Sequence, residues 1–192
     1  MRSDEFNSLM IQCAALGHLI SRLQHALPHY HVREGLSIES SAVRRTLLVT
    51  HALTTCASLR LQTIYAACGD IDAGNRAVSS AKWILESFGD VSVPDFNVLH
   101  PIVGSLCLVA CQTLIDELRR IEALNDARYH EQLNMLRTTI MAGMTNMSIL
   151  GVDSPFMSQI SKWSVLSVLT DFPGFQLAQV QIAYSGARNI GL

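Results

Sequence analysis

The sequence predicts an all-α fold, an irregular bundle of about six to seven helices that forms one domain over residues 1–192. Apolar residues recur at spacings of three and four along most of the chain, which places them on one face of a helix. No segment shows the strict alternation of apolar and polar residues that is typical of a half-buried strand. Glycine and proline interrupt the apolar pattern at intervals that match the length of ordinary helices.

The first predicted helix begins with Ser3 or Asp4 as its N-cap and ends before Pro28. Its apolar positions alternate at four and three and share one face: Leu9, Cys13, Leu16, Ile20, Leu23 and Leu27. Residues 28–40 combine Pro, Gly and Ser without a sustained period, so we expect a loop there.

The second predicted helix runs from Ala42 to Cys68, with Ser40 or Ser41 as its cap. It carries two apolar stripes. One contains Leu47, Leu53, Ala57, Leu61, Ile64 and Cys68, and the other contains Val49, Ala52, Cys56 and Leu59. A helix with apolar residues on two sides is expected to be central to the fold.

The third predicted helix starts at Asp70 or Asp72 and stops at Gly89, and Gly69 is a suitable residue to end the helix before it. Its apolar positions are Ala77, Ala81, Ile84, Leu85 and Phe88. Because the connection between the second and third helices is short, we expect them to be antiparallel neighbours.

Further helices are predicted along the rest of the chain. A short helical turn follows residue 95, and a long helix runs from Pro101 to about Leu124, since proline fits the first turn of a helix. The next helix begins at Asn125 or Asp126 and ends at Gly151, with a buried face of Leu133, Leu136, Ile140, Met144 and Met147. A shorter helix is expected over 155–169, and a last one over 175–192.

Charge and composition exclude several classes of function. The net charge is −2, so the chain has no electrostatic field that attracts DNA or an anionic membrane, and we expect no direct DNA binding. Residues 96–115 carry no formal charge, but polar residues and Pro101 interrupt them, so a buried helix is favoured over a membrane span. The N-terminus is acidic where a secretory signal is basic, which predicts a protein that stays inside the cell.

The chain is unusually apolar for a protein that faces water on all sides. Charged residues make up only 16% of it, and the mean hydropathy is +0.26. Either most of the apolar surface is buried, or a partner covers part of it. We therefore expect protein partners, or self-association through exposed apolar surface.

No catalytic motif is present, and we predict that the chain is not an enzyme. It lacks a glycine-rich phosphate loop, a zinc-protease helix, a nucleophile elbow and a C-x-x-C pair. The close carboxylates are Asp70 with Asp72, and Asp116 with Glu117 and Glu122. The first pair is interpreted as helix capping and the second group as a solvated helix face, so we expect no catalytic residue.

No complete metal site is predicted, and no cofactor. The five cysteines, Cys13, Cys56, Cys68, Cys107 and Cys111, lie in apolar helical stretches and are interpreted as small, reduced core residues. Cys107 and Cys111 are the closest pair, four residues apart, whereas a structural zinc site usually needs four ligands.

Histidines and methionines offer two weaker candidates. His25, His29 and His31, with Glu34 nearby, have spacings that a metal could use, and a surface histidine loop is the favoured interpretation. His51 and His100 are interpreted as hydrogen-bonded core histidines. The methionines are Met135, Met141, Met144 and Met147, and they either belong to the core or line an adaptable groove.

One part of the sequence resembles a known family. Residues 46–62 are similar to the L-L-x-T-H-x-L-x-H-x-A-x-I-x-L-H helix in the regulatory region of fungal-specific, zinc-cluster transcription factors. His51 matches one histidine of this pattern, whereas Thr55 and Gln62 stand where the family has its second and third histidines.

Two later segments extend the resemblance. Residues 76–82 resemble the alanine-containing helix that follows in the family, and residues 99–104 resemble its L-x-P-x-x-G entry into a long apolar helix. The resemblance is strongest over residues 42–124.

The resemblance implies an all-helical regulatory domain that acts in transcriptional control in the nucleus, through protein or effector interactions. The DNA-binding module of that family, in which six cysteines hold two zinc ions, has no counterpart in this chain. Neither zinc nor DNA binding is therefore implied. Three alternatives remain open: a helical small-molecule sensor with an apolar pocket, a free-standing protein-interaction domain, and a bundle enzyme, for which no paired set of inward carboxylates or histidines is evident.

Overall fold

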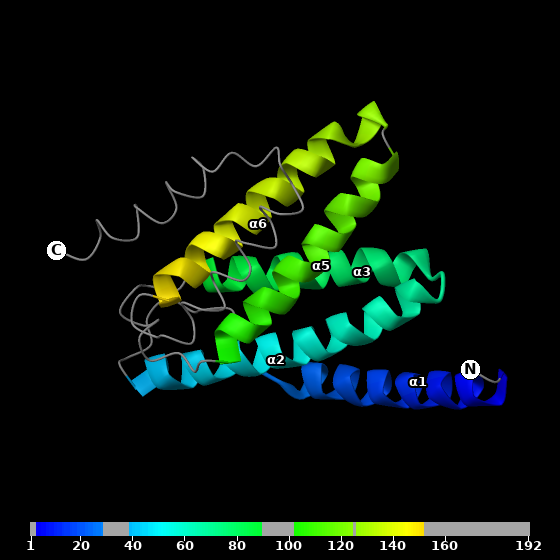
Figure 1. Ribbon diagram of the computed structural model, residues 1–192. Coiled ribbons are helices and arrows are strands. Elements are labelled where there is room, and N and C mark those ends of the chain that lie inside the picture. The colour runs from blue at the N-terminus through cyan, green and yellow to red at the C-terminus, as the bar shows by residue number, and fades with distance from the viewer. Residues whose placement is uncertain (1–2, 29–38, 90–101, 125, 152–192) are drawn as a thin grey trace. The chain divides into compact units, whose positions relative to one another are not determined.

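The computed structural model describes residues 3–28, 39–89, 102–124 and 126–151. These residues form five α-helices and one 3-10 turn and contain no strand, which confirms the predicted all-α class (Figure 1). The elements are α1 (Ser3–Ala26), α2 (Glu39–Ala67), α3 (Ile71–Gly89), α5 (Ile102–Leu124), η1 (Ala127–Tyr129) and α6 (His130–Gly151). The chain divides into two compact units, residues 1–80 and residues 81–192, with the boundary inside α3.

In the first unit, α1 and α2 pack along each other in opposite directions (Figure 1). Gly17 lies against α2, because a Cβ atom at this position would lie 2.9 Å from Cδ2 of Leu61. His51 connects the C-terminal end of α1 to α2, since its Nε2 lies 2.8 Å from the carbonyl oxygen of Pro28. A glycine in a helix costs stability by itself, and here it leaves room for the Leu61 side chain.

The turn between α2 and α3 has the hydrogen bonds of a Schellman motif. Gly69 has a φ of +97°, and its N–H donates to the carbonyl of Ala66 at 2.9 Å. The N–H of Asp70 donates to the carbonyl of Tyr65 at 3.1 Å. The carboxylate of Asp70 then accepts from the N–H of Ala73 at 2.9 Å, so Asp70 caps α3 as predicted.

Gln62 connects α2 to the first half of α3. Its amide nitrogen donates to the hydroxyl of Ser58 on its own helix at 3.1 Å, and its amide oxygen accepts from the hydroxyl of Ser80 at 3.4 Å. This contact confirms that the second and third helices are neighbours. The side chain therefore makes a polar contact between the two helices.

The second unit has a continuous apolar core. Ten residues of α5 are buried: Val103, Gly104, Leu106, Cys107, Ala110, Cys111, Leu114, Ile115, Leu118 and Ile121. The second half of α3 adds Ile84, Leu85 and Phe88, and α6 packs against α5 with Leu136, Ile140 and Met144. The buried faces predicted for α3 and α6 are confirmed at these positions. Leu133 is only half-buried, and the side chain of Met147 lies outside the described part of the chain.

Two helix starts differ from the prediction. The α2 helix begins at Glu39, so Ser40 and Ser41 lie within its first turn and do not precede it. The α6 helix begins at His130 and not at residue 125 or 126, because Asp126 starts a 3-10 turn first. The expected turn after residue 95 and the expected helices over 155–169 and 175–192 lie outside the described residues.

The hydrogen bonds of Asp126 account for this 3-10 turn. Its carbonyl accepts from the N–H of Tyr129 at 3.1 Å, which is an i to i+3 bond, and its carboxylate accepts from the N–H of Arg128 at 2.9 Å. An ion pair with the guanidinium of Arg128 at 2.6 Å holds the carboxylate in place.

Gly143 tests the packing of the second unit, and Gly74 in the first unit is its control. A Cβ atom at Gly143 would lie 2.9 Å from both Cδ atoms of Leu85 and 3.2 Å from Sγ of Cys111, and both of these side chains are buried. At Gly74 the nearest atom would be Cβ of Ala66 at 3.7 Å, an ordinary contact. We expect Gly143→Ala to lower the free energy of unfolding by about 1–3 kcal/mol, whereas Gly74→Ala raises it by about 0.5–1 kcal/mol.

Urea denaturation followed by circular dichroism measures both changes. If Gly143→Ala stabilised the chain as much as Gly74→Ala does, the close packing of α3, α5 and α6 around Gly143 would be wrong.

Candidate functional site

An apolar surface on α1 and α2 is the main candidate site. Nine large apolar side chains are exposed among the described residues of these two helices, and we call six of them the α1–α2 face: Leu9, Leu16, Leu19, Leu23, Leu53 and Ile64. Their exposed fractions run from 39% at Leu53 to 57% at Leu19. Isolated exposed leucines are common on proteins, whereas a contiguous group of this kind marks an interaction site.

The predicted apolar face of α1 is only partly buried. Of the six positions that share the predicted stripe, only Cys13 is buried; Ile20 and Leu27 are half-buried, and the other three are exposed. The residues that turn toward α2 are Met10, Cys13, Gly17, Ile20, Gln24 and Leu27. The apolar arc of α1 is therefore wider than its contact with α2, and the remainder faces outward.

The first apolar stripe of α2 divides in the same way. Leu61 is 7% exposed where it meets α1, whereas Leu53 and Ile64 are exposed. The second stripe is buried as predicted at Ala52, Cys56 and Leu59, and its Val49 is half-buried.

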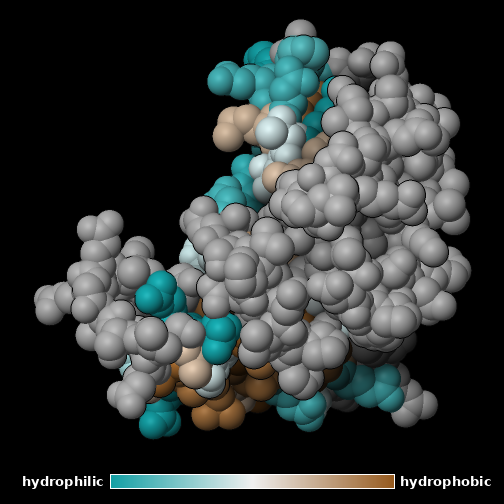
Figure 2. All heavy atoms as spheres, turned by 90° about the vertical axis from the view of Figure 1, so that its left-hand side faces the viewer, coloured by the Kyte–Doolittle hydropathy of each residue, from teal (hydrophilic) through white to brown (hydrophobic). Residues whose placement is uncertain are grey.

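Helix geometry places both groups on the same side of the α1–α2 contact. At 3.6 residues per turn, the four leucines of α1 lie about 60–140° around the helix from Cys13 and Gly17. On α2, Leu53 and Ile64 lie about 60–80° from the contact residue Leu61, in the same rotational sense. Because the helices are antiparallel, rotations of the same sense bring both groups to one side. Figure 2 shows brown, apolar atoms gathered along its lower edge, where α1 and α2 lie.

His51 has a structural role in this unit. A carbonyl oxygen only accepts hydrogen bonds, so the bond to Pro28 requires the Nε2–H form of the ring. The side chain is half-buried and hydrogen-bonded, close to the predicted core histidine. Thr54 is buried beside it and donates to the His51 carbonyl at 2.9 Å. His51 thus holds Pro28, which follows the end of α1, against the middle of α2.

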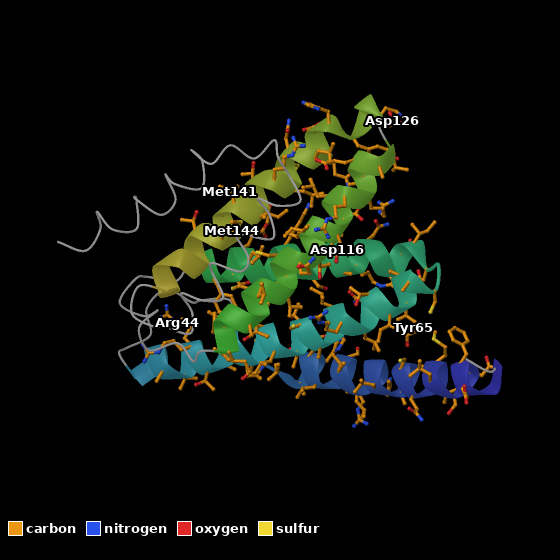
Figure 3. All side chains as sticks on the ribbon, viewed as in Figure 1. Arg44, Tyr65, Asp116, Asp126, Met141 and Met144 are labelled. Atoms are coloured by element: carbon orange, nitrogen blue, oxygen red, sulfur yellow. The ribbon has the colours of Figure 1, made fainter. Side chains whose placement is uncertain are left out.

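The acidic residues do not converge on one point. Figure 3 shows Asp116 within α5 and Asp126 at the turn before α6. Asp116 accepts from Arg119 at 3.0 Å, and Glu117 binds Arg120 through two bonds of 2.7 and 2.8 Å. Each carboxylate therefore has a basic partner on its own helix, which is the arrangement of a solvated helix surface.

The remaining acidic candidates also have structural partners. Glu122 accepts from Arg137 at 2.7 Å and so joins α5 to α6, while Asp70 caps α3 and pairs with Arg76 at 3.5 Å. Asp72 lies in the first turn of α3, where a negative charge stabilises the helix dipole.

The histidine candidates are described only in part. Nδ1 of His25 lies 2.7 Å from the carbonyl oxygen of Ser21 on its own helix. His29, His31, Glu34 and His100 lie outside the described residues. Within the described part of the chain, no three His, Cys, Asp or Glu side chains are close enough together to hold a metal ion.

The methionines and one surface hollow are two further candidate features. Figure 3 shows Met141 and Met144 along α6; Met144 is buried and Met141 half-buried, whereas Met135 is exposed, so these three methionines do not line one groove. A hollow of about 680 Å³ lies along η1 and α6, lined by side chains such as Arg128, His130 and Glu131. The hollow is shallow and lacks the enclosed apolar walls of a typical ligand pocket. Arg128, which lines it, already pairs with Asp126.

Comparison with known proteins gives no relative. No protein-family model, curated protein or solved structure matches this chain. No helix among the described residues is long and apolar enough to cross a membrane.

The cysteines differ sharply in environment. Cys68 is exposed, whereas the other four are buried. Burial raises the pKa of Cys111 to about 12, and it also raises the pKa of Cys56, against a smaller opposite effect of the positive charge of Arg60. A pKa near 12 leaves roughly one thiolate in ten thousand at pH 8.

We therefore expect the native protein to show one fast thiol in Ellman's assay at pH 8. Cys68→Ser should remove the fast phase, and Cys111→Ser should leave it unchanged. A fast phase that survives in Cys68→Ser would mean that one of the four thiols described as buried is accessible.

Proposed function

We propose that this chain is a regulatory and protein-interaction domain of a fungal zinc-cluster-type transcription factor that acts in transcriptional control in the nucleus. The α1–α2 face is the observation that carries the proposal, because it offers an exposed apolar surface of the kind that binds another protein. The similarity of residues 46–62 to the regulatory region of that family supplies the biological context.

The structural roles of the matching segment agree with this proposal. It lies within α2, the helix that contacts α1 on one side and the first half of α3 on another. Residues that connect helices, such as His51 and Gln62, hold the surface of α2 in a fixed relation to α1. A domain whose surface is held rigidly in this way loses little conformational entropy when it binds a partner.

A reporter assay in a fungal cell tests the proposed function. The full chain is fused to an unrelated DNA-binding domain, and we expect reporter output to change at least about fivefold, up or down, relative to that domain alone. Leu16→Glu, in the middle of the α1–α2 face, should remove the change. Ile11→Glu is the matched control, because Ile11 is on the same helix, 71% exposed and outside the face. Output equal to that of the DNA-binding domain alone, at equal protein level, would contradict the proposal.

A second consequence concerns DNA. The net charge of −2 and the paired state of many arginines predict that the isolated chain binds no DNA sequence specifically. Fluorescence anisotropy with short duplexes at physiological salt measures this. Sequence-dependent binding tighter than about 1 μM would be beyond ordinary non-specific affinity and would refute the prediction.

A further inference from the structure

We propose that the α1–α2 face binds a second copy of this chain, which makes the interaction domain a homodimer. The inference rests on the proposed function, because both use the same surface. It adds the identity of the partner and the geometry of the contact.

The spacing of the exposed leucines is the first argument. Leu9, Leu16 and Leu23 recur every seven residues, which is the repeat by which one helix packs into another over several turns. Leu19 and Gln12 complete the alternation of three and four on the same outward side. The stripe continues over most of α1, so it is long enough to hold a helix and not merely a loop.

The area is the second argument. Each of the six side chains exposes roughly half of its surface, so two copies that meet through this face bury on the order of 1,000–1,200 Å². Specific interfaces begin near this size, and flanking residues such as Ala57 and Gln12 add to it. The face therefore has enough area for a dimer of itself, with an affinity in the micromolar range typical of a small interface.

Symmetry is the third argument. When two antiparallel helix pairs meet face to face about a twofold axis in the interface plane, each helix is antiparallel to the helix it meets. The dipoles of the two facing helices then point in opposite directions, which is electrostatically favourable. The six residues carry no charge, and Arg60, which is exposed on the α2 stripe between Leu53 and Ile64, has a side chain long enough to keep its guanidinium at the rim of the contact.

Gln12 lies within the leucine stripe and gives the contact a register. Its amide both donates and accepts hydrogen bonds, so it can pair with a polar group of the other copy while leucines surround it. A single polar residue in an apolar seam fixes alignment at some cost in stability. A partner of arbitrary apolar surface would leave this amide unsatisfied, which disfavours non-specific association.

Sedimentation velocity of the full chain, from about 1 to 100 μM, tests the proposal directly. We expect a monomer–dimer equilibrium. Leu16→Glu should weaken the dimer at least about 100-fold, because each copy then places a carboxylate against leucines. Ile11→Glu should change the dissociation constant less than about threefold. Both variants alter exposed positions, and far-UV circular dichroism checks that each retains the helical fold; Leu19→Glu replaces Leu16→Glu if that variant unfolds.

Three results would overturn the proposal. A wild-type chain that stays monomeric at 100 μM and binds an apolar dye would show that the face is open to a different partner. A monomer that does not bind the dye would show that the chain itself covers the face. A dimer unaffected by Leu16→Glu and Leu19→Glu would place the contact elsewhere.

The two proposals fail separately. If the chain dimerises but the reporter does not respond, the function in transcription is wrong and the dimer stands. If the reporter responds and loses its response in Leu16→Glu while the chain is monomeric, the face binds another protein and the dimer is wrong.

Discussion

One packing constraint determines most of what this structure presents to its surroundings: α1 is apolar around about half of its circumference, and α2 contacts only part of that arc. A single neighbouring helix covers a stripe roughly 100° wide. The contact at Gly17 shows which stripe is covered, because a Cβ atom there would lie 2.9 Å from Cδ2 of Leu61. The leucines on one side of this contact are then left outside the fold of the first unit. The α1–α2 face is therefore a consequence of the way the two helices meet.

How far the sequence predicts the fold depends on how tightly each helix is enclosed. The five apolar positions predicted for α3 are all buried, because α3 has a sharp start at Asp70 and one narrow apolar face. For α1 the spacing of the leucines correctly predicted a helix with a common apolar face. It did not show which part of a wide apolar arc meets a neighbour, since periodicity describes a helix by itself and the neighbour's position depends on α2.

The sequence predicted that apolar surface is exposed, but it did not predict which residues form that surface. High apolar content and few charges predicted exposed apolar surface, but five of the six residues that form it were assigned to the apolar stripes of the predicted helices, and Leu19 was left out. At 100° per residue, Leu19 extends the apolar side of α1 beyond the six stripe positions. The histidine of the family pattern was correctly predicted to be hydrogen-bonded. Its partner, the Pro28 carbonyl, could not be predicted, because 23 residues separate the two in the chain.

The residues of α1 that contact α2 are different from the outward leucines of the α1–α2 face. Replacing the outward leucines of α1 with polar residues would leave Cys13 and Gly17 in contact with α2, so the pair would keep its main contacts and gain solubility. The sequence instead keeps apolar side chains at Leu9, Leu16 and Leu23, where water contact is unfavourable at roughly 25 cal/mol per Å². The second unit encloses its apolar residues well, as the buried positions of α5 show, so the chain is able to bury such side chains elsewhere. Their exposure on α1 therefore has a free-energy cost that any partner covering the α1–α2 face would remove.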